Sequence, residues 1–155
     1  MIKKILKIAL AAIAAIVFIF LALLAGIRDA NNFKTSVLKG LNIQLMGVVY
    51  DVDYVDEGFY HGSGIVRLRI ITSNVKEYHP PASAKYFYCV IKKQKAEIYE
   101  GATGVVPGDT ITIDTERQLI GIFGPGKYGR QHEVGSISVS SDDGYYNYIK
   151  HHHQF

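Results

Sequence analysis

Length and charge limit the kinds of protein this chain can be. It has 155 residues, with 17 Lys and Arg against 14 Asp and Glu, giving a formal net charge of +3 at pH 7. Lys3, Lys4 and Lys7 account for the whole excess, because the 14 basic residues that follow balance the 14 acidic ones. A nucleic-acid-binding domain needs a basic surface, so the neutral remainder of the chain argues against that class.

Cys89 is the single cysteine. One cysteine cannot form an intramolecular disulfide, and it excludes a cysteine-based zinc or redox site within one chain. No motif calls for a cofactor, and we expect none.

A short basic head at residues 1–7 precedes an apolar run at residues 8–27, bounded by Ile8 and Ile27. A helix of that length rises about 30 Å, the hydrocarbon thickness of a bilayer. The run is longer than the usual apolar region of a signal peptide, and no clean A-x-A box follows it. We therefore predict an uncleaved transmembrane signal anchor, with a cleaved signal peptide as the alternative.

Basic residues flank the apolar run on both sides, so charge counting alone does not orient it. A short basic head before a first span usually stays in the cytoplasm. We expect the N-terminus in the cytoplasm and the domain outside, in the periplasm or at the cell surface. Ala11 and Ala15 form a small-xxx-small pair that favours helix-mediated self-association, although alanine is also simply a good helix former.

Residues 28–42 are polar with scattered apolar positions and are expected to form a juxtamembrane linker. Asp29 or Asn31 can cap one short amphipathic helix, and Gly40 can end it. We interpret this stretch as a spacer.

After the linker, the pattern changes from helical to alternating, which predicts a β domain at residues 43–142. Strand-like segments lie at residues 43–54, 65–72, 86–91, 96–99, 110–114, 118–123 and 134–140. Gly47 separates two apolar phases in the first segment and predicts a β-bulge at or beside it.

Pro107 and Gly108 stand at the second and third positions of a predicted type II turn, Val106-Pro107-Gly108-Asp109. A strand that follows such a turn resembles those of OB-like and SH3-like barrels. The fold class we predict is all-β, a small barrel or sandwich of six to seven short antiparallel strands, preceded by one N-terminal transmembrane helix.

The first two strands fit an antiparallel hairpin in which charged and apolar pairs fall on opposite faces. In that register Asp51 lies opposite Arg69, and Asp53 lies opposite Arg67. These four residues are expected to form structural ion pairs rather than a metal site.

Loop aromatic and histidine residues are the candidate binding residues, because tyrosine is enriched in interfaces and long loops often carry function. They are Phe59, Tyr60, His61, Tyr78, His79, Tyr128 and His132.

Two metal patterns are considered and set aside. The acidic run at Asp51, Asp53, Asp56 and Glu57 lacks EF-hand spacing. The histidines at 151–153 stand in a Tyr/His-rich C-terminal tail, residues 143–155, whose end we expect to be disordered. No metal site is predicted.

Catalytic candidates are few, and no motif supports them. His61, His79, His132, Ser63 and Cys89 occur outside any nucleophile-elbow, zincin or phosphate-loop context. We therefore expect no enzyme.

Two functional classes stay open. In the first, the protein is a single-pass, membrane-anchored extracytoplasmic binding or scaffolding module of a membrane-associated assembly, with a protein partner of unknown identity. In the second, it is a small-ligand or metal-ion-binding domain, or a minor hydrolase, whose loop His, Asp and Glu residues converge in one cleft.

Overall fold

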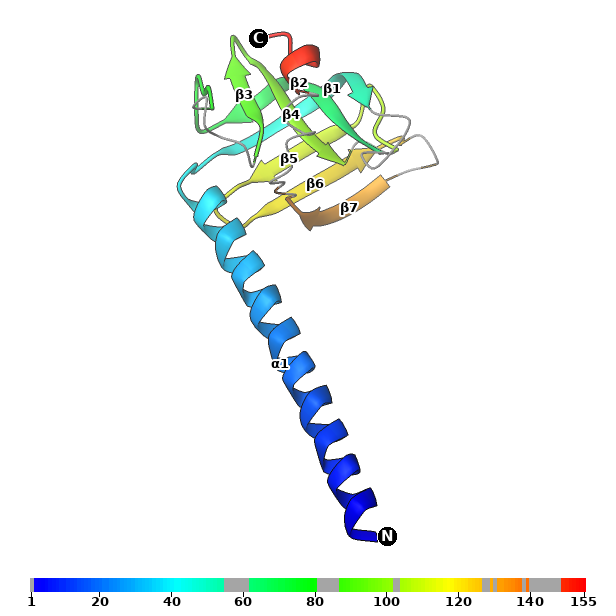
Figure 1. Cartoon of the computed structure of the whole chain (residues 1–155). Helices are drawn as coiled ribbons and strands as arrows, with labels where there is room; N and C mark the ends of the chain where they lie inside the picture. The colour runs from blue at the N-terminus through cyan, green and yellow to red at the C-terminus, as the bar shows by residue number, and fades with distance from the viewer. Residues whose placement is uncertain are drawn as a thin grey trace. The chain divides into compact units, whose positions relative to one another are not determined.

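A computed structural model describes residues 2–54, 62–80, 87–101, 104–126, 129, 131–137, 139 and 149–155. The chain divides into two compact units, Met1–Ser36 and Val37–Phe155. The first unit is helical, and the second contains the β-sheet (Figure 1).

Helix α1 (Ile2–Lys39) is continuous over 38 residues (Figure 1). The prediction of a separate short helix beginning at Asp29 or Asn31 is therefore wrong. No proline interrupts the helix, and it continues through Gly26. The helix ends before Gly40, as predicted, and Leu38 in its last turn is fully buried in the β domain.

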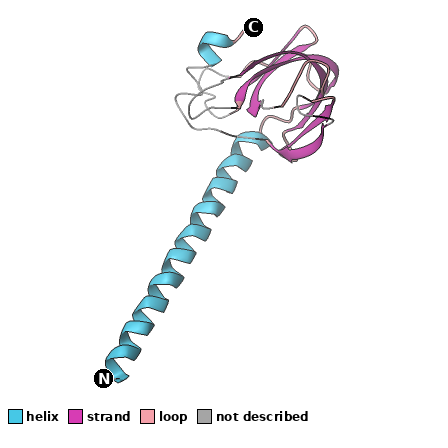
Figure 2. Cartoon of the chain, turned by 90° about the vertical axis from the view of Figure 1, so that its right-hand side faces the viewer, coloured by secondary structure: helices cyan, strands magenta, loops and turns pink. Residues whose placement is uncertain are grey.

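The described strands form one antiparallel sheet of seven strands in the order β3-β4-β2-β1-β5-β6-β7. Their bounds are β1 (Gln44–Tyr54), β2 (Ser63–Ser73), β3 (Cys89–Lys92), β4 (Lys95–Gly101), β5 (Thr110–Asp114), β6 (Leu119–Gly124) and β7 (Gln131–Ser136). The all-β prediction with an N-terminal helix is confirmed. The sheet curves around its core (Figure 2) but does not close into a barrel.

Strands β1 and β2 form the predicted antiparallel hairpin, but the predicted register is wrong by two or three residues. Asp51 lies opposite Arg67, Asp53 lies opposite Ile65, and Arg69 lies opposite Val48. Strand β2 begins at Ser63, two residues before the predicted segment, and Tyr54 pairs with Gly64, so the connection between the strands is shorter than the sequence suggested.

Two bulges explain the rest of the register. A shift does lie beside Gly47, but the extra residue there is Ile71 of β2. A Cβ on Gly47 would lie 2.8 Å from the Arg69 carbonyl oxygen, so glycine allows this close approach. The second extra residue is Tyr50, where β1 changes which side faces the core. Val49, rather than Val48, is therefore buried.

The concave side of the sheet holds the main core. Its members come from the end of α1, from six of the strands and from the segments between them. They include Leu38, Ile43, Leu45, Val49, Val66, Leu68, Phe87, Cys89, Ile91, Ile98, Val105, Ile111, Ile113, Ile120 and Ile137. Thr115 fixes the chain at Ile43, just before β1, because its hydroxyl oxygen accepts a hydrogen bond from Ile43 N at 2.8 Å.

The predicted turn before β5 is confirmed. Asp109 N donates to Val106 O at 3.1 Å, and Gly108 has φ +99°, as a type II turn requires. The fully buried Asp109 carboxylate then accepts from Val106 N at 2.9 Å and from Gly126 N at 3.0 Å. It joins this turn to the segment after β6.

The last strand begins three residues earlier than predicted, at Gln131 rather than Val134, and ends at Ser136. Its described side chains are exposed, and β7 occupies one end of the sheet order. An edge strand of this kind lacks the apolar alternation by which buried strands are recognised.

Candidate functional site

The curved sheet has a second face, turned away from the main core, which we call the outer face. Its residues alternate along each strand with the core residues. On the half formed by β1, β5 and β6, it carries Gln44, Met46, Thr112, Asp114, Leu119 and Gly121.

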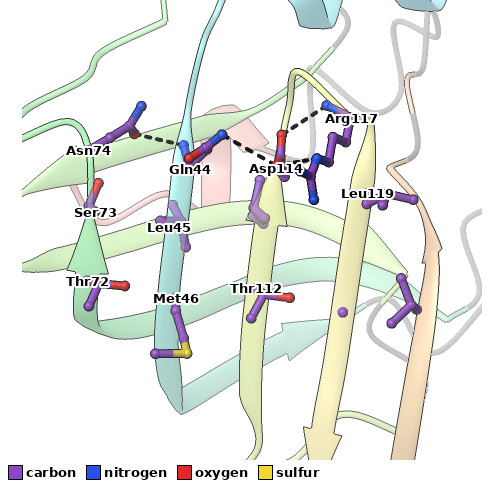
Figure 3. Close-up of a pocket in the computed structure, with 13 residues that line it drawn as sticks. Gln44, Leu45, Met46, Thr72, Ser73, Asn74, Thr112, Asp114, Arg117 and Leu119 are labelled. Atoms are coloured by element: carbon purple, nitrogen blue, oxygen red, sulfur yellow. Dashed lines mark hydrogen bonds and ion pairs between the residues drawn. The ribbon is translucent and has the colours of Figure 1, made fainter.

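A groove of about 470 Å³ lies on this half of the outer face, across the end of β2 and strands β1, β5, β6 and β7 (Figure 3). Leu119 and Val134 line it and are 40% and 61% exposed, so the groove presents apolar surface to solvent. Gly121 keeps the floor low, because a Cβ there would lie 2.5 Å from the Thr112 hydroxyl oxygen.

A row of polar residues borders the groove (Figure 3). Gln44 N donates to Asn74 Oδ1 at 2.7 Å, and Gln44 Nε2 donates to Asp114 Oδ2 at 3.4 Å. Arg117 N donates to Asp114 Oδ1 at 2.9 Å, while its side chain is 77% exposed. The border therefore offers a positioned amide and a solvent-facing guanidinium to a ligand.

The groove lining suits binding better than catalysis. Among its described residues there is no His, Cys, Lys or Glu. Its one carboxylate, Asp114, already accepts from Gln44 and Arg117. A nucleophile with an adjacent base is thus not found among these residues.

The other half of the outer face, on β2, β3 and β4, carries a buried charged cluster that we call the Arg67–Glu97 cluster. Arg67 is 3% exposed and Glu97 is fully buried. Arg67 Nε lies 3.4 Å from Glu97 Oε1, and its Nη1 donates to Asp51 Oδ2. Tyr88 OH donates to Glu97 Oε2 at 3.0 Å, and Asp53 Oδ2 lies 3.8 Å from Arg67 Nη2.

Burial and charge shape the protonation of this cluster. Burial lowers the pKa of the Arg67 guanidinium, but its hydrogen bond to Asp51 and the charge of Glu97 more than offset this, so the pKa is raised. Burial and the hydrogen-bonded Glu97 carboxylate raise the pKa of the Tyr88 phenol well above its ordinary value. The cluster is therefore held as a guanidinium and a neutral phenol at neutral pH.

Residues 149–155, which we call the C-terminal segment, cover the cluster. Residues 149–152 form a helical turn, and Ile149 is buried against Ile65, Tyr88, Val90 and Tyr99. The expectation of a disordered C-terminal end is wrong for these residues, because apolar and polar contacts hold them to the sheet.

Of the seven predicted binding residues, Phe59, Tyr60, His61 and Tyr128 lie outside the described residues. Their role as binding residues stays a prediction.

The other three predicted residues are placed on two different edges of the sheet order. Tyr78 pairs with Ile91 of β3 through two backbone hydrogen bonds, and its half-buried side chain packs against the core. Burial raises the pKa of its phenol. His79 follows it and is exposed. His132 lies on β7, with its ring centroid 4.9 Å from that of Phe123.

The ion-pair residues are partly rearranged relative to the prediction. Arg67 contacts both Asp51 and Asp53, and Arg69 is exposed further along β2. Within the described part of the chain, no group of three or more His, Cys, Asp or Glu side chains has the geometry to hold a metal ion.

Sequence reasoning missed Glu97 and the C-terminal segment. Glu97 alternates with the core residues Ala96 and Ile98, so its parity assigns it to the outer face. The sequence did contain a signal for this pair. Arg67 and Glu97 carry opposite charges, and each lies near the middle of its strand at a position that faces away from the core. Ile149 and Phe155, which flank the histidines, were the signal for a docked segment.

The fold and its outer face define a small all-β domain on a chain with an N-terminal apolar helix. Comparison with known proteins finds no matching family model, no similar curated protein and no matching solved structure.

Proposed function

We propose that this protein is a single-pass, membrane-anchored binding module whose β domain holds a partner protein in the outer-face groove. The observation that carries the proposal is the groove itself, with exposed apolar side chains in its lining, a polar border and no catalytic pair among its described lining residues. An apolar hollow with a few oriented polar groups is the usual form of a binding site.

The anchor part of the proposal rests on α1. Within the described residues, one helix is long and apolar enough to cross a membrane, and its apolar side chains are exposed within the molecule. Lipid is the environment in which such a surface is stable. The basic head at Lys3, Lys4 and Lys7 favours a cytoplasmic N-terminus and an extracytoplasmic domain.

The groove favours an extended peptide segment as the bound part of the partner. Apolar side chains of such a segment can face Met46, Leu119 and Val134, while its polar groups meet Gln44 and Arg117. Strand β7 borders the groove at one end of the sheet order, where an added strand can pair with it.

A small-molecule ligand is the second candidate, because about 470 Å³ lies within the range of small-ligand pockets. A peptide partner is preferred, since the groove is open along several strands and contains no aromatic residue among its described lining.

Site-specific photocrosslinking in cells that make the full-length protein tests the proposal. A benzophenone amino acid at Val134, inside the groove, is expected to give a discrete protein adduct. The same probe at Glu133, the neighbouring exposed position of β7 that does not line the groove, is the matched control. Thr112→Arg, which fills the groove floor, should abolish the adduct.

Equal adducts at positions 133 and 134, or an adduct unaffected by Thr112→Arg, would contradict the groove as the binding site. If the benzophenone at Val134 gives no protein adduct and is instead occupied by small metabolites, the small-ligand candidate is favoured.

A further inference from the structure

The C-terminal segment is attached to the outer face as a bound peptide would be. Ile149 at its beginning and Phe155 at its end pack into the same apolar cluster of the sheet, which includes Ile65, Tyr88 and Val90. Between these two anchors, His151 and His153 are exposed. The two anchors lie six positions apart, so the described apolar contacts select two side chains rather than the whole sequence of the segment.

The polar contacts of the segment are made mainly by its backbone. Arg67 Nη2 donates to His152 O at 2.7 Å, and Gln154 N donates to Glu97 Oε1 at 2.9 Å. A side-chain contact adds to these, between His152 Nδ1 and Asp53 Oδ2 at 2.9 Å. Peptide-binding sites commonly combine main-chain hydrogen bonds with pockets for spaced side chains.

The receiving groups are positioned by the sheet itself. Asp51 orients Arg67 through Nη1, and Tyr88 holds the Oε2 atom of Glu97. Register places Arg67 directly opposite Glu97 on neighbouring strands β2 and β4. Arg67 Nη2 and Glu97 Oε1 are the atoms that face the segment, so a preorganised donor and acceptor meet a peptide carbonyl and a peptide N–H.

Charge on this face is polarised along the segment. Near His152, the carboxylates of Asp51, Asp53 and Glu97 outnumber the single guanidinium of Arg67. At the other end, a hollow of about 290 Å³ beside Gln154 and Phe155 is lined by lysines 92, 93 and 95. A peptide with a basic residue in the middle and acidic residues after its last apolar anchor complements both ends.

We propose that this face is a second peptide-binding site, which the C-terminal segment occupies in cis. Its ligand is a partner segment with an apolar residue, a basic residue three positions later, an aromatic residue three positions after that, and acidic residues following. The cis segment competes with such a partner and so sets the affinity threshold for it. This site is separate from the groove lining and does not depend on the groove's function.

Binding of a synthetic peptide to the full-length protein in detergent micelles tests this site. The labelled peptide carries the sequence of residues 149–155 followed by two aspartates. Ile149→Asp combined with Phe155→Asp removes both anchors of the cis segment. This variant is expected to bind the peptide at least about tenfold more tightly than the unaltered protein, because cis competition is lost.

Two substitutions test the chemistry of recognition in that released variant. Lys93→Glu should weaken binding of the aspartate-tailed peptide several-fold and leave the untailed peptide unchanged. Lys39→Glu, at an exposed lysine in the last turn of α1 that does not line this hollow, is the matched control and should change neither. A peptide with both apolar anchors replaced by Asp should not bind.

The buried Cys89 thiol reports whether each variant is folded, since it is fully protected in the native domain. A released variant with a protected thiol that binds no peptide overturns the proposal. A second test uses a variant truncated after residue 148. If it exposes the thiol and added peptide does not restore protection, the segment is a fixed part of the fold and the proposal fails. Restored protection supports it.

Discussion

At the scale of single residues, the Arg67–Glu97 cluster shows how strongly a buried charge depends on its partner. Glu97 is fully buried on a strand face, a position where an ionised carboxylate is costly unless paired and hydrogen-bonded. Arg67, Tyr88 and the backbone of Gln154 supply those contacts. The pair is therefore expected to be strongly coupled in its effect on stability.

Arg67→Met should destabilise the protein by about 3 kcal/mol, because it leaves Glu97 buried without its cation. The double variant Arg67→Met with Glu97→Leu should lose less than the sum of the two single losses, since neither charge is then stranded. Urea unfolding of the four proteins in the cycle measures this. Additive losses would mean that the two side chains do not interact in solution.

Alkaline pH should destabilise the domain. Burial raises the pKa of the Cys89 thiol from 9.0 to about 12, and the pKa of the Tyr88 phenol is also raised. The unfolded chain releases both protons first, so this stabilisation is complete below about pH 9 and is lost as pH rises toward 12. Tyr88→Phe should reduce the pH dependence of the unfolding free energy between pH 9 and 11. If the dependence of the unfolding free energy on pH is unchanged in this variant, Tyr88 does not contribute to the alkaline destabilisation.

Part of this residue-level arrangement follows from the sequence and part does not. The charges at positions 51, 53 and 67 are correctly placed on one strand face by alternation. Burial of Arg67 depends on a segment more than 80 residues later, through His152 O. Alternation along a strand gives the face of a residue but not what covers that face.

At the scale of elements, the tight turns decide how neighbouring strands meet. Lys92 pairs with Lys95, so that Lys93 and Gln94 form a two-residue hairpin loop between β3 and β4. Both loop residues have positive φ, at 49° and 63°. Such loops prefer Asn and Gly, so this hairpin is built from residues that fit its backbone poorly.

Gln94→Gly should therefore stabilise the protein by about 0.5 kcal/mol, because the relief of strain exceeds the added flexibility of the unfolded chain. Gly108→Ala in the type II turn is the matched opposite and should destabilise by about 1 kcal/mol. Nothing lies within 4 Å of a Cβ at Gly108, so its φ of +99° is the cause. The midpoint of urea unfolding should rise for Gln94→Gly and fall for Gly108→Ala. Shifts in the same direction would contradict the role given to positive φ.

The sequence predicts a strand that overlaps each described strand of the sheet, although it places β7 three residues too late. It misplaces the β1–β2 register by two residues at both ends of the pairing, a shift that keeps every side chain on its face, and the extra residues Tyr50 and Ile71 change the register by one more residue between them. A bulge alters parity without any change in composition, so a hydrophobic pattern fits two registers equally well.

At the scale of the whole molecule, the described structure joins an exposed apolar helix and a β domain in one chain. The proposed topology places the β domain outside the cytoplasm, and the basic head is the main determinant.

Protease added to spheroplasts should digest the β domain while leaving a membrane-embedded fragment that contains α1. Replacing Lys3, Lys4 and Lys7 with Glu should reduce the fraction of digested molecules, because the positive head no longer retains the N-terminus. Immunoblotting with tags at either end measures both fractions. A domain that stays protected until the membrane is permeabilised would reverse the proposed orientation.

The order of strands also has a consequence for biosynthesis. β1 is central in the sheet, but its partner β5 comes much later, with Gln44 pairing to Asp114 across 70 residues. At 5–20 residues per second, translation leaves the open edge of β1 without that partner for roughly 4 to 14 seconds. An unpaired strand edge attracts other strands. The nascent chain is therefore most prone to misassociation in this interval, and a chaperone acting on it would need to bind between synthesis of β2 and synthesis of β5.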